Sequence, residues 1–85
     1  MKIIDLKDII ISIKPNIMQN QISEKTNIIE DLLFDSLDVV EYFSMIEEKF
    51  DLDIFNGQFD FDNLTNIGQS LIGFNEVNTD ENTIK

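Results

Sequence analysis

A helix-periodic, acidic stretch between residues 36 and 50 constrains the fold of this 85-residue chain more than any other feature. Val39, Phe43, Ile46 and Phe50 are spaced by four, three and four residues, which places them on one stripe of an α-helix. The acidic residues of the stretch fall at other positions around that helix. The pattern therefore predicts an amphipathic helix that packs its apolar stripe inward and turns its acidic surface outward.

Three other segments show helical signals. Apolar residues recur at helical spacing over about residues 3–14, and Pro15 ends that segment because the residue before a proline avoids helical geometry. "FDFDNL" is long enough for a short helix only, and Thr65 is expected to cap a last helix that carries apolar residues to Phe74. No segment alternates as a strand does. The predicted fold is all-α, a small bundle of three main helices plus one short helix.

The length of the chain predicts one domain with a small core, because a chain this short buries only about 60–65% of its unfolded surface. We expect the domain to cover residues 1–74. Residues 75–85 have low apolar density and are expected to form a flexible tail. The polar segment 15–34 is expected to be irregular, with Ile17, Met18 and Ile22 as its anchors to the core.

Charge is the strongest compositional signal. Seventeen acidic and six basic residues give a formal net charge of −11. Between residues 30 and 62 there are eleven acidic residues and one basic residue, Lys49, so this segment alone carries −10. Such a field repels nucleic-acid phosphates and anionic membrane surfaces, and it speeds encounters with proteins that carry basic patches. The charge predicts protein partners, with no nucleic acid and no membrane insertion.

The chain lacks cysteine and histidine, which removes disulfides, thiolate sites, the commonest general base and the commonest metal ligand. The acidic run "DLDIFNGQFDFD" puts Phe55 and Asn56 where a calcium-binding EF-hand loop needs a ligand and a glycine. We therefore expect no specific metal site and no catalytic activity. Asp5, Lys7 and Asp8 interrupt the apolar start, unlike a secretory signal, so the cytoplasm is the expected location.

The segment "DSLD" begins the acidic helix and admits two interpretations. Asp35 can cap the helix, and Asp38, three residues later, resembles the partner in a capping box. On this interpretation the chain is an acidic interaction module with a capped helix and no prosthetic group. The cap, however, does not explain Ser36, whose hydroxyl is expected to be exposed at the first helical position, or the apolar Leu37 beside it. The other interpretation is an attachment point.

Together with the sequence on both sides of it, this segment resembles the acyl carrier protein family. The similarity covers about residues 3–74. "TNIIEDLLFDSLDVVEYFSMIEEKFDLDI" follows the family through the loop before the serine and along the next helix, and "NLTNIGQSLIGF" resembles its final helix. D-S-L alone is only three residues, but here it opens an acidic amphipathic helix at the family's usual distance from the N-terminus. That combination makes the resemblance specific.

The resemblance implies that Ser36 carries a covalent 4′-phosphopantetheine group, which a phosphopantetheinyl transferase takes from coenzyme A. The terminal thiol of that group holds acyl groups as thioesters. The chain would be a monomeric carrier, not an enzyme, that docks on acyl-loading and acyl-processing enzymes through their basic patches. The positions that match the family's docking face are Asp35, Leu37, Asp38, Val40, Glu41, Glu47 and Glu48.

Fatty acid biosynthesis is the commonest role of the family, but some departures favour a specialised D-alanyl, aminoacyl or polyketide carrier as the alternative. Leu33 stands where fatty-acid carriers usually have glycine, and "LLFDS" is closer to the "LLDS" of specialised carriers. This chain also departs from the specialised carriers. They usually have a glycine where this chain has Leu32, and D-alanyl carriers usually have a tryptophan, which this chain lacks. Tyr42 and Phe43 are bulkier than the usual aliphatic residues, which predicts a core too full to shelter a long acyl chain. Further aromatic residues available to that core are Phe59, Phe61 and Phe74.

Overall fold

The structure is a computed structural model that describes the backbone of residues 1–56 and 59–84 and the side chains of residues 1–56 and 59–76. Its elements, in chain order, are α1 (Ile3–Ile13), the 3-10 helix η1 (Gln19–Gln21), α2 (Ser36–Phe50), α3 (Phe61–Leu64) and α4 (Ile67–Ile84). The described backbone contains no strand, only an isolated bridge between Asn27 and Asn66. The predicted all-α fold, with three long helices and one short helix, is confirmed.

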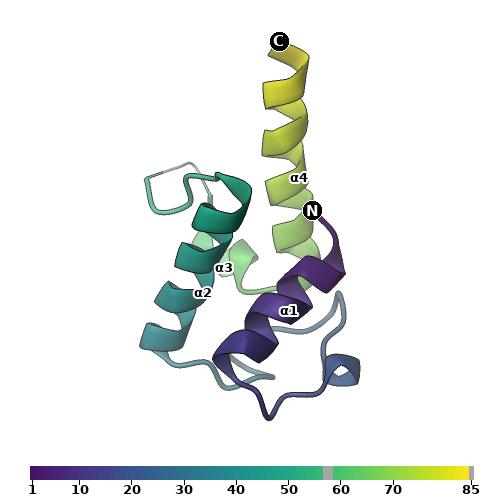
Figure 1. Ribbon diagram of the computed structural model, residues 1–85, viewed down its shortest axis with the longest axis vertical. Helices are drawn as coiled ribbons and strands as arrows, with labels where there is room; N and C mark the ends of the chain where they lie inside the picture. Colours follow the sequence, from purple (N-terminus) through teal and green to yellow (C-terminus); the bar gives the residue numbers. More distant parts are fainter. Residues whose placement is uncertain (57–58, 85) are drawn as a thin grey trace.

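The helices pack around one apolar core. α1 contacts both α2 and α4, and α3 contacts α4, while the last turns of α4 extend past the other elements (Figure 1). The predicted stripe of α2 points inward, with Phe43 and Ile46 buried and Val39 and Phe50 partly buried. The buried apolar side chains are Leu6, Ile9, Ile10, Ile22, Ile28, Leu32, Phe34, Tyr42, Phe43, Ile46, Leu52, Ile54, Leu64, Ile67 and Phe74.

The long connection between α1 and α2 is held to the start of α4 by backbone hydrogen bonds. The Ile28 N–H donates to the Thr65 carbonyl at 2.9 Å, and the Gly68 N–H donates to the Glu24 carbonyl at 2.9 Å. These bonds satisfy polar groups that a loop without regular structure must pair elsewhere. They fix the segment that leads into α2 and Ser36.

Two expectations, one about this connection and one about the start of α4, need correction. Met18 was expected to anchor the loop, but its side chain is exposed, and Ile22 is the buried anchor. Thr65 was expected to cap the last helix, but the cap is Asn66, whose side-chain oxygen accepts from the Gln69 N–H at 2.9 Å. The Thr65 hydroxyl instead donates to a carbonyl of α3 at 2.8 Å. The difference arises because α3 ends directly before α4 begins.

The last helix extends beyond the apolar residues that predicted it. Those residues end at Phe74, and α4 continues to Ile84. Residues after 74 carry few apolar side chains, so their helix depends on backbone hydrogen bonds that continue an established helix, which costs less than starting one. The division into a carrier domain over residues 1–74 and a flexible tail over 75–85 remains a prediction, and Lys85 lies outside the described residues.

Candidate functional site

Ser36 is the first residue of α2, and its side chain is exposed to solvent. The helix is capped by the preceding residue: the Asp35 side chain accepts from the Asp38 N–H at 2.9 Å, and the Asp38 side chain accepts from the Asp35 N–H at 3.1 Å. This reciprocal pair is the predicted capping box. Because Asp35 satisfies the helix end, the Ser36 hydroxyl is not needed for capping and is accessible for chemistry.

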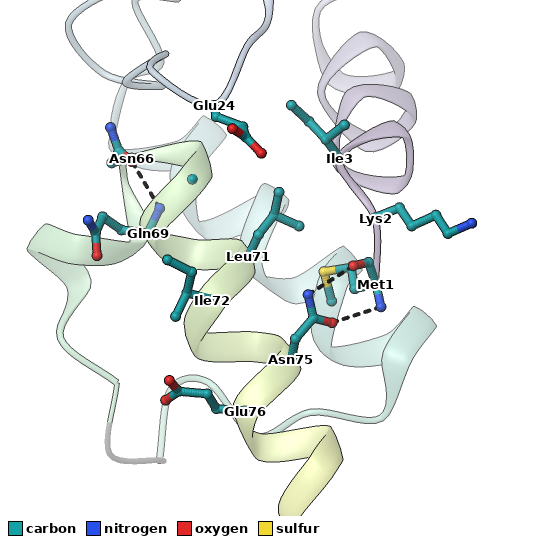
Figure 2. A pocket seen from close by; sticks show the side chains of 11 residues that line it. Met1, Lys2, Ile3, Glu24, Asn66, Gln69, Leu71, Ile72, Asn75 and Glu76 are labelled. Carbon is teal, nitrogen blue, oxygen red and sulfur yellow. Dashed lines mark hydrogen bonds between the residues drawn. The ribbon is translucent and has the colours of Figure 1, made fainter.

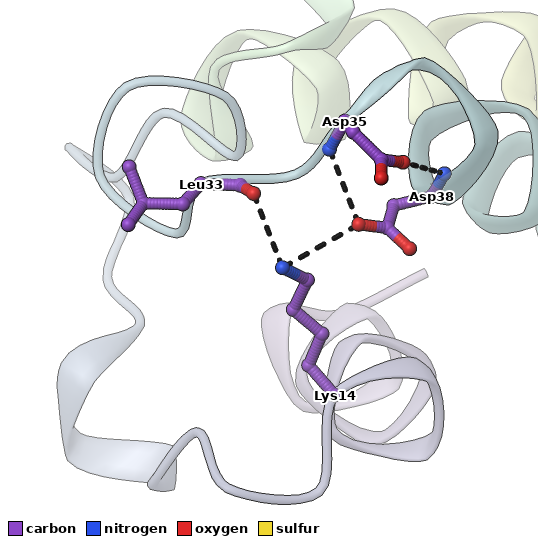
Figure 3. Close-up of polar contacts among 4 residues, drawn as sticks. All are labelled: Lys14, Leu33, Asp35 and Asp38. Atoms are coloured by element: carbon purple, nitrogen blue, oxygen red, sulfur yellow. Dashed lines mark hydrogen bonds and ion pairs between the residues drawn. The ribbon is translucent and has the colours of Figure 1, made fainter.

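Lys14, just after the end of α1, closes a polar cluster at this site (Figure 3). Its Nζ donates to the Leu33 carbonyl at 3.1 Å and lies 3.4 Å from Asp38 Oδ2. The same Nζ lies 5.5 Å from the centre of the Phe34 ring, within the range of a cation–π contact. The pKa of Asp38 is lowered, first by the hydrogen bond from the Asp35 backbone and further by Lys14. Sequence reasoning missed Lys14, because nothing in the spacing of residues 14 and 38 indicates that they meet.

Leu33 has a left-handed backbone, with φ 59°. A non-glycine residue in this region costs about 1–2 kcal/mol, because its Cβ approaches the following carbonyl oxygen. Sequence reasoning noted Leu33 as a departure from the glycine usual in fatty-acid carriers, and the structure shows a physical reason why glycine suits this position. The Leu33 side chain is 74% exposed, so burial of the leucine does not offset the backbone cost.

Apolar side chains are exposed around Ser36. Leu37, the next residue of α2, is 79% exposed, as the sequence predicted from its place off the core stripe. Val40, one turn after Ser36, is half exposed, and Ile29 is exposed on the preceding loop. Large apolar side chains exposed close together are typical of contact surfaces for partners.

The acidic residues expected on the docking face fall into two groups. Glu41 and Glu48 are exposed on α2. Asp35 and Asp38 belong to the capping box, and Glu47 is partly buried, where it accepts hydrogen bonds from the backbone of the α2–α3 loop at 2.6 and 3.1 Å. Glu41 and Glu48 are therefore the two acidic residues of the predicted set whose side chains form no hydrogen bond or ion pair among the described contacts.

An apolar groove of about 510 Å³ opens beside Ser36, between the start of α2, the preceding loop and α3. Phe43, which is buried, contacts two aromatic rings that line the groove, with ring centres 5.6 Å from Phe61 and 6.2 Å from Phe55. Phe61 was expected to fill the core, but it is 44% exposed. It lies on the one-turn helix α3, which is too short to turn every apolar residue inward. Phe55 was not predicted to contribute, and only its apolar character within an acidic loop marks it in the sequence.

A second groove, of about 920 Å³, lies between the start of α1 and α4, on residues distinct from those around Ser36 (Figure 2). Its lining includes Asn75, which holds both the amino group and the carbonyl of Met1 at 2.9 and 3.0 Å. In the part of the chain whose side chains are described, no three acidic residues are arranged to hold a metal ion. Among the helices described, none combines the length and apolar character needed to cross a membrane.

Two curated acyl carrier proteins are similar to this chain. The protein from Sulfurovum sp. (strain NBC37-1) is 40% identical over 50 residues, which is 59% of this chain and 65% of that protein. The protein from Wolinella succinogenes is 38% identical over 50 residues, 59% of this chain and 64% of that protein. Over these 50 residues this chain is similar to the acyl carrier proteins. The similarity supports the family predicted from "DSLD" and its surroundings.

The similarity to these acyl carrier proteins is partial in length, because the matched region spans slightly less than two thirds of each relative. No protein-family model matches the chain. No solved structure matches it either.

Proposed function

We propose that this chain is a carrier protein that holds acyl groups as thioesters on a 4′-phosphopantetheine arm attached to Ser36. The observation that carries the proposal is the exposed Ser36 at the first position of α2, next to a cap supplied by Asp35. The relatives named acyl carrier protein support it. The chain itself then has no catalytic step to perform, which suits a sequence without histidine or cysteine.

The residues at the site fit a covalently attached phosphate ester. The N-terminal end of a helix favours negative charge, because its first N–H groups lack helical partners and the helix dipole is positive there. In the attachment step, the Ser36 oxygen forms a bond to the phosphorus of coenzyme A as the bond to its adenosine bisphosphate half breaks. The hydroxyl proton passes to a base of the transferase. When bound, the group supplies a thiol that this chain lacks.

The surface around Ser36 fits enzymes that dock transiently through basic patches. Glu41 and Glu48 steer such partners, and Leu37 with Val40 supplies a small apolar centre. Steering with a small contact area gives fast association and fast release. The set expected from the family also includes Asp35, Asp38 and Glu47, which we propose as secondary contacts because each already binds backbone groups of this chain. We infer that the carrier works as a monomer in the cytoplasm.

For the pathway, we propose fatty acid biosynthesis, the commonest role of acyl carriers. Leu33 and Phe43 favour the second candidate, a carrier dedicated to a D-alanyl, aminoacyl or polyketide pathway. The observation that separates the two is the acyl group found on Ser36 of protein purified from its native cell. A saturated or 3-hydroxy fatty acyl group supports the first, and an amino acid or a polyketide intermediate supports the second.

Intact-mass measurement tests the attachment site. The protein is incubated with coenzyme A and a broad-specificity phosphopantetheinyl transferase, and wild type should gain the mass of one phosphopantetheinyl group. Ser36→Ala should gain none. Ser44→Ala is the matched control, because Ser44 is also exposed on α2, and it should be modified like wild type. An unmodified wild type would favour the acidic interaction module without a prosthetic group.

A further inference from the structure

Lys14 connects three segments that meet at Ser36. Among the side chains that the structure describes, Lys14 and Asp38 form the only ion pair, at 3.4 Å, although the chain has 17 acidic residues. The same ammonium group donates to the Leu33 carbonyl at 3.1 Å. One side chain thus joins the end of α1, the loop before the serine and the first turn of α2 (Figure 3).

The Leu33 carbonyl accepts from Lys14 while the residue holds a left-handed backbone, with φ 59°. A leucine resists this conformation, so contacts around it must hold it in place. Phe34, the next residue, is buried, and its ring lies under the Lys14 ammonium at 5.5 Å. Lys14 therefore contacts the backbone and a buried ring at the point where the chain enters α2.

We propose that Lys14 is a positioning residue that fixes the loop before α2 and thereby sets how well Ser36 reacts with its transferase. The proposal rests on the proposed function, since it concerns the same serine. Lys14 acts through the Leu33 carbonyl and the Asp38 carboxylate, and it need not touch the transferase. Leu33→Gly should make Lys14 less necessary, because glycine adopts positive φ without a Cβ clash.

Electrostatic steering and positioning predict opposite effects for the loss of Lys14. Removal of its charge makes the surface around Ser36 more negative, so steering alone would speed association with a basic transferase and raise kcat/KM. Positioning predicts a lower kcat, because Ser36 is held less often in the reactive geometry. The direction of change therefore separates the two effects.

The experiment measures kcat and KM for transfer from coenzyme A, with the full chain as the protein substrate. Lys14→Met removes the charge and keeps most of the length of the side chain, and Lys14→Arg keeps the charge and N–H donors. Lys7→Met is the matched control, because it removes the same charge from α1, seven residues before Lys14. Circular dichroism melts establish that each variant is folded at the assay temperature.

We expect Lys14→Met to lower kcat by about three- to tenfold, the range that corresponds to the net contribution of one typical hydrogen bond. Lys14→Arg should restore most of the rate, and Lys7→Met should leave kcat unchanged. Lys14→Met should lower kcat less in a Leu33→Gly background than in wild type. In a Leu33→Ala background it should lower kcat as much as in wild type, because alanine keeps the Cβ although it also removes most of the exposed side chain.

An unchanged or higher kcat in Lys14→Met, with wild type fully modified, would overturn the positioning role and leave the proposed function intact. An equal loss of kcat in the wild-type and Leu33→Gly backgrounds would also overturn it, because Lys14 would then act otherwise than by holding the backbone at Leu33. Failure of wild type to gain any mass is a different result. It removes the proposed function, and the positioning role with it.

Discussion

The carboxylate of Glu47, on α2, accepts the backbone N–H of Ile54 at 2.6 Å and so fastens the α2–α3 loop to the helix. The next N–H of the loop, from Phe55, reaches the same oxygen at 3.1 Å. Ile54 itself is buried, so this contact joins a loop anchor to the helix that carries Ser36. Glu47 therefore serves the fold of this chain directly.

We expect Glu47→Ala to lower the free energy of unfolding by about 1–3 kcal/mol, because two backbone donors lose their acceptor, one of them on a buried residue. Glu48→Ala removes the adjacent exposed carboxylate and should change stability by less than about 0.5 kcal/mol. Urea unfolding followed by far-UV circular dichroism measures both values. Equal midpoints for the two variants would show that the Glu47 contact contributes nothing to the fold.

Charge reversal at the exposed acids should affect association with partners rather than stability. Glu41→Lys and Glu48→Lys should each lower kcat/KM for the transferase mainly through the association rate, because Coulomb attraction acts on the encounter. Raising salt from about 0.01 to 0.15 M shortens the screening length from about 30 to 8 Å, so the wild-type rate should fall as well. Glu24→Lys makes the same charge change outside α2 and should have the smaller effect. A kcat/KM that depends neither on salt concentration nor on these charges would refute electrostatic docking.

Tyr42 presents the next test, because its side chain is fully buried and its hydroxyl has no hydrogen-bond partner among the described residues. An unpaired buried hydroxyl costs about 1–3 kcal/mol, so Tyr42→Phe should leave stability unchanged or raise it by about 1 kcal/mol. Thermal unfolding near neutral pH measures the difference. A loss of more than 1 kcal/mol would mean that the hydroxyl is hydrogen-bonded in solution.

The same tyrosine predicts a pH dependence. Burial raises the pKa of Tyr42 above its ordinary value of 10.0. The folded state then keeps the proton that the unfolded state releases. The free energy of unfolding is therefore at its full value below about pH 10 and falls as the pH rises above it. Tyr42→Phe should lose less stability than wild type between pH 9 and 11. Because the chain has one tyrosine, ultraviolet absorbance reports its ionisation directly.

Two glycines of α4 should respond in opposite directions to the same change. A Cβ at Gly68 would lie 2.8 Å from the Glu24 carbonyl oxygen, so Gly68→Ala must displace backbone that helps to hold the α1–α2 connection and should be destabilising. At Gly73 the nearest atoms, of the Phe59 ring, lie at 3.6 Å, an ordinary contact. Gly73→Ala should therefore stabilise the helix by about 0.5–1 kcal/mol. Thermal melts of the two variants test the pair, and a Gly68→Ala protein as stable as Gly73→Ala would contradict it.

The sequence predicted the helices well where periodicity and capping act within one segment. The bounds of α2 follow from Asp35, the Val39 to Phe50 stripe and the acidic surface, and all of these are local signals. The site was predictable to the same extent: the "DSLD" segment indicates an exposed serine beside an exposed leucine, and the structure has both. The family that the sequence indicated agrees with the relatives found.

The features that sequence reasoning missed depend on contacts between distant segments. Lys14 meets Asp38 only after α1 packs on α2, and Glu47 meets Ile54 only after the following loop folds back. Glu47 was assigned to the docking face because its position matches that face in the family, and nothing in the local sequence indicates that it holds the following loop. The left-handed backbone of Leu33 is likewise set by tertiary contacts, since leucine itself disfavours that conformation.

The groove beside Ser36 changes what is expected of a long acyl cargo. The core was expected to be too full to admit one, and Phe43, at 1% exposure, closes the inner side of the groove with the rings of Phe55 and Phe61 against it. The groove itself is open and lined mainly by apolar side chains. An acyl chain carried on Ser36, as proposed, can therefore lie along the groove without displacing core side chains.

We expect a long acyl group on the phosphopantetheine of Ser36 to shift amide resonances at groove positions such as Val39 and Val40, relative to an acetyl group. Ile46, which is fully buried and does not line the groove, should shift little, because entry into the core would displace packed side chains at a cost of about 1–3 kcal/mol. Phe61→Ala removes an exposed wall of the groove and should reduce the shifts at Val39 and Val40. Large shifts at Ile46, together with a higher melting temperature for the long-chain form, would instead show that the chain enters the core. That result would remove the packing argument for a specialised carrier and favour fatty acid biosynthesis.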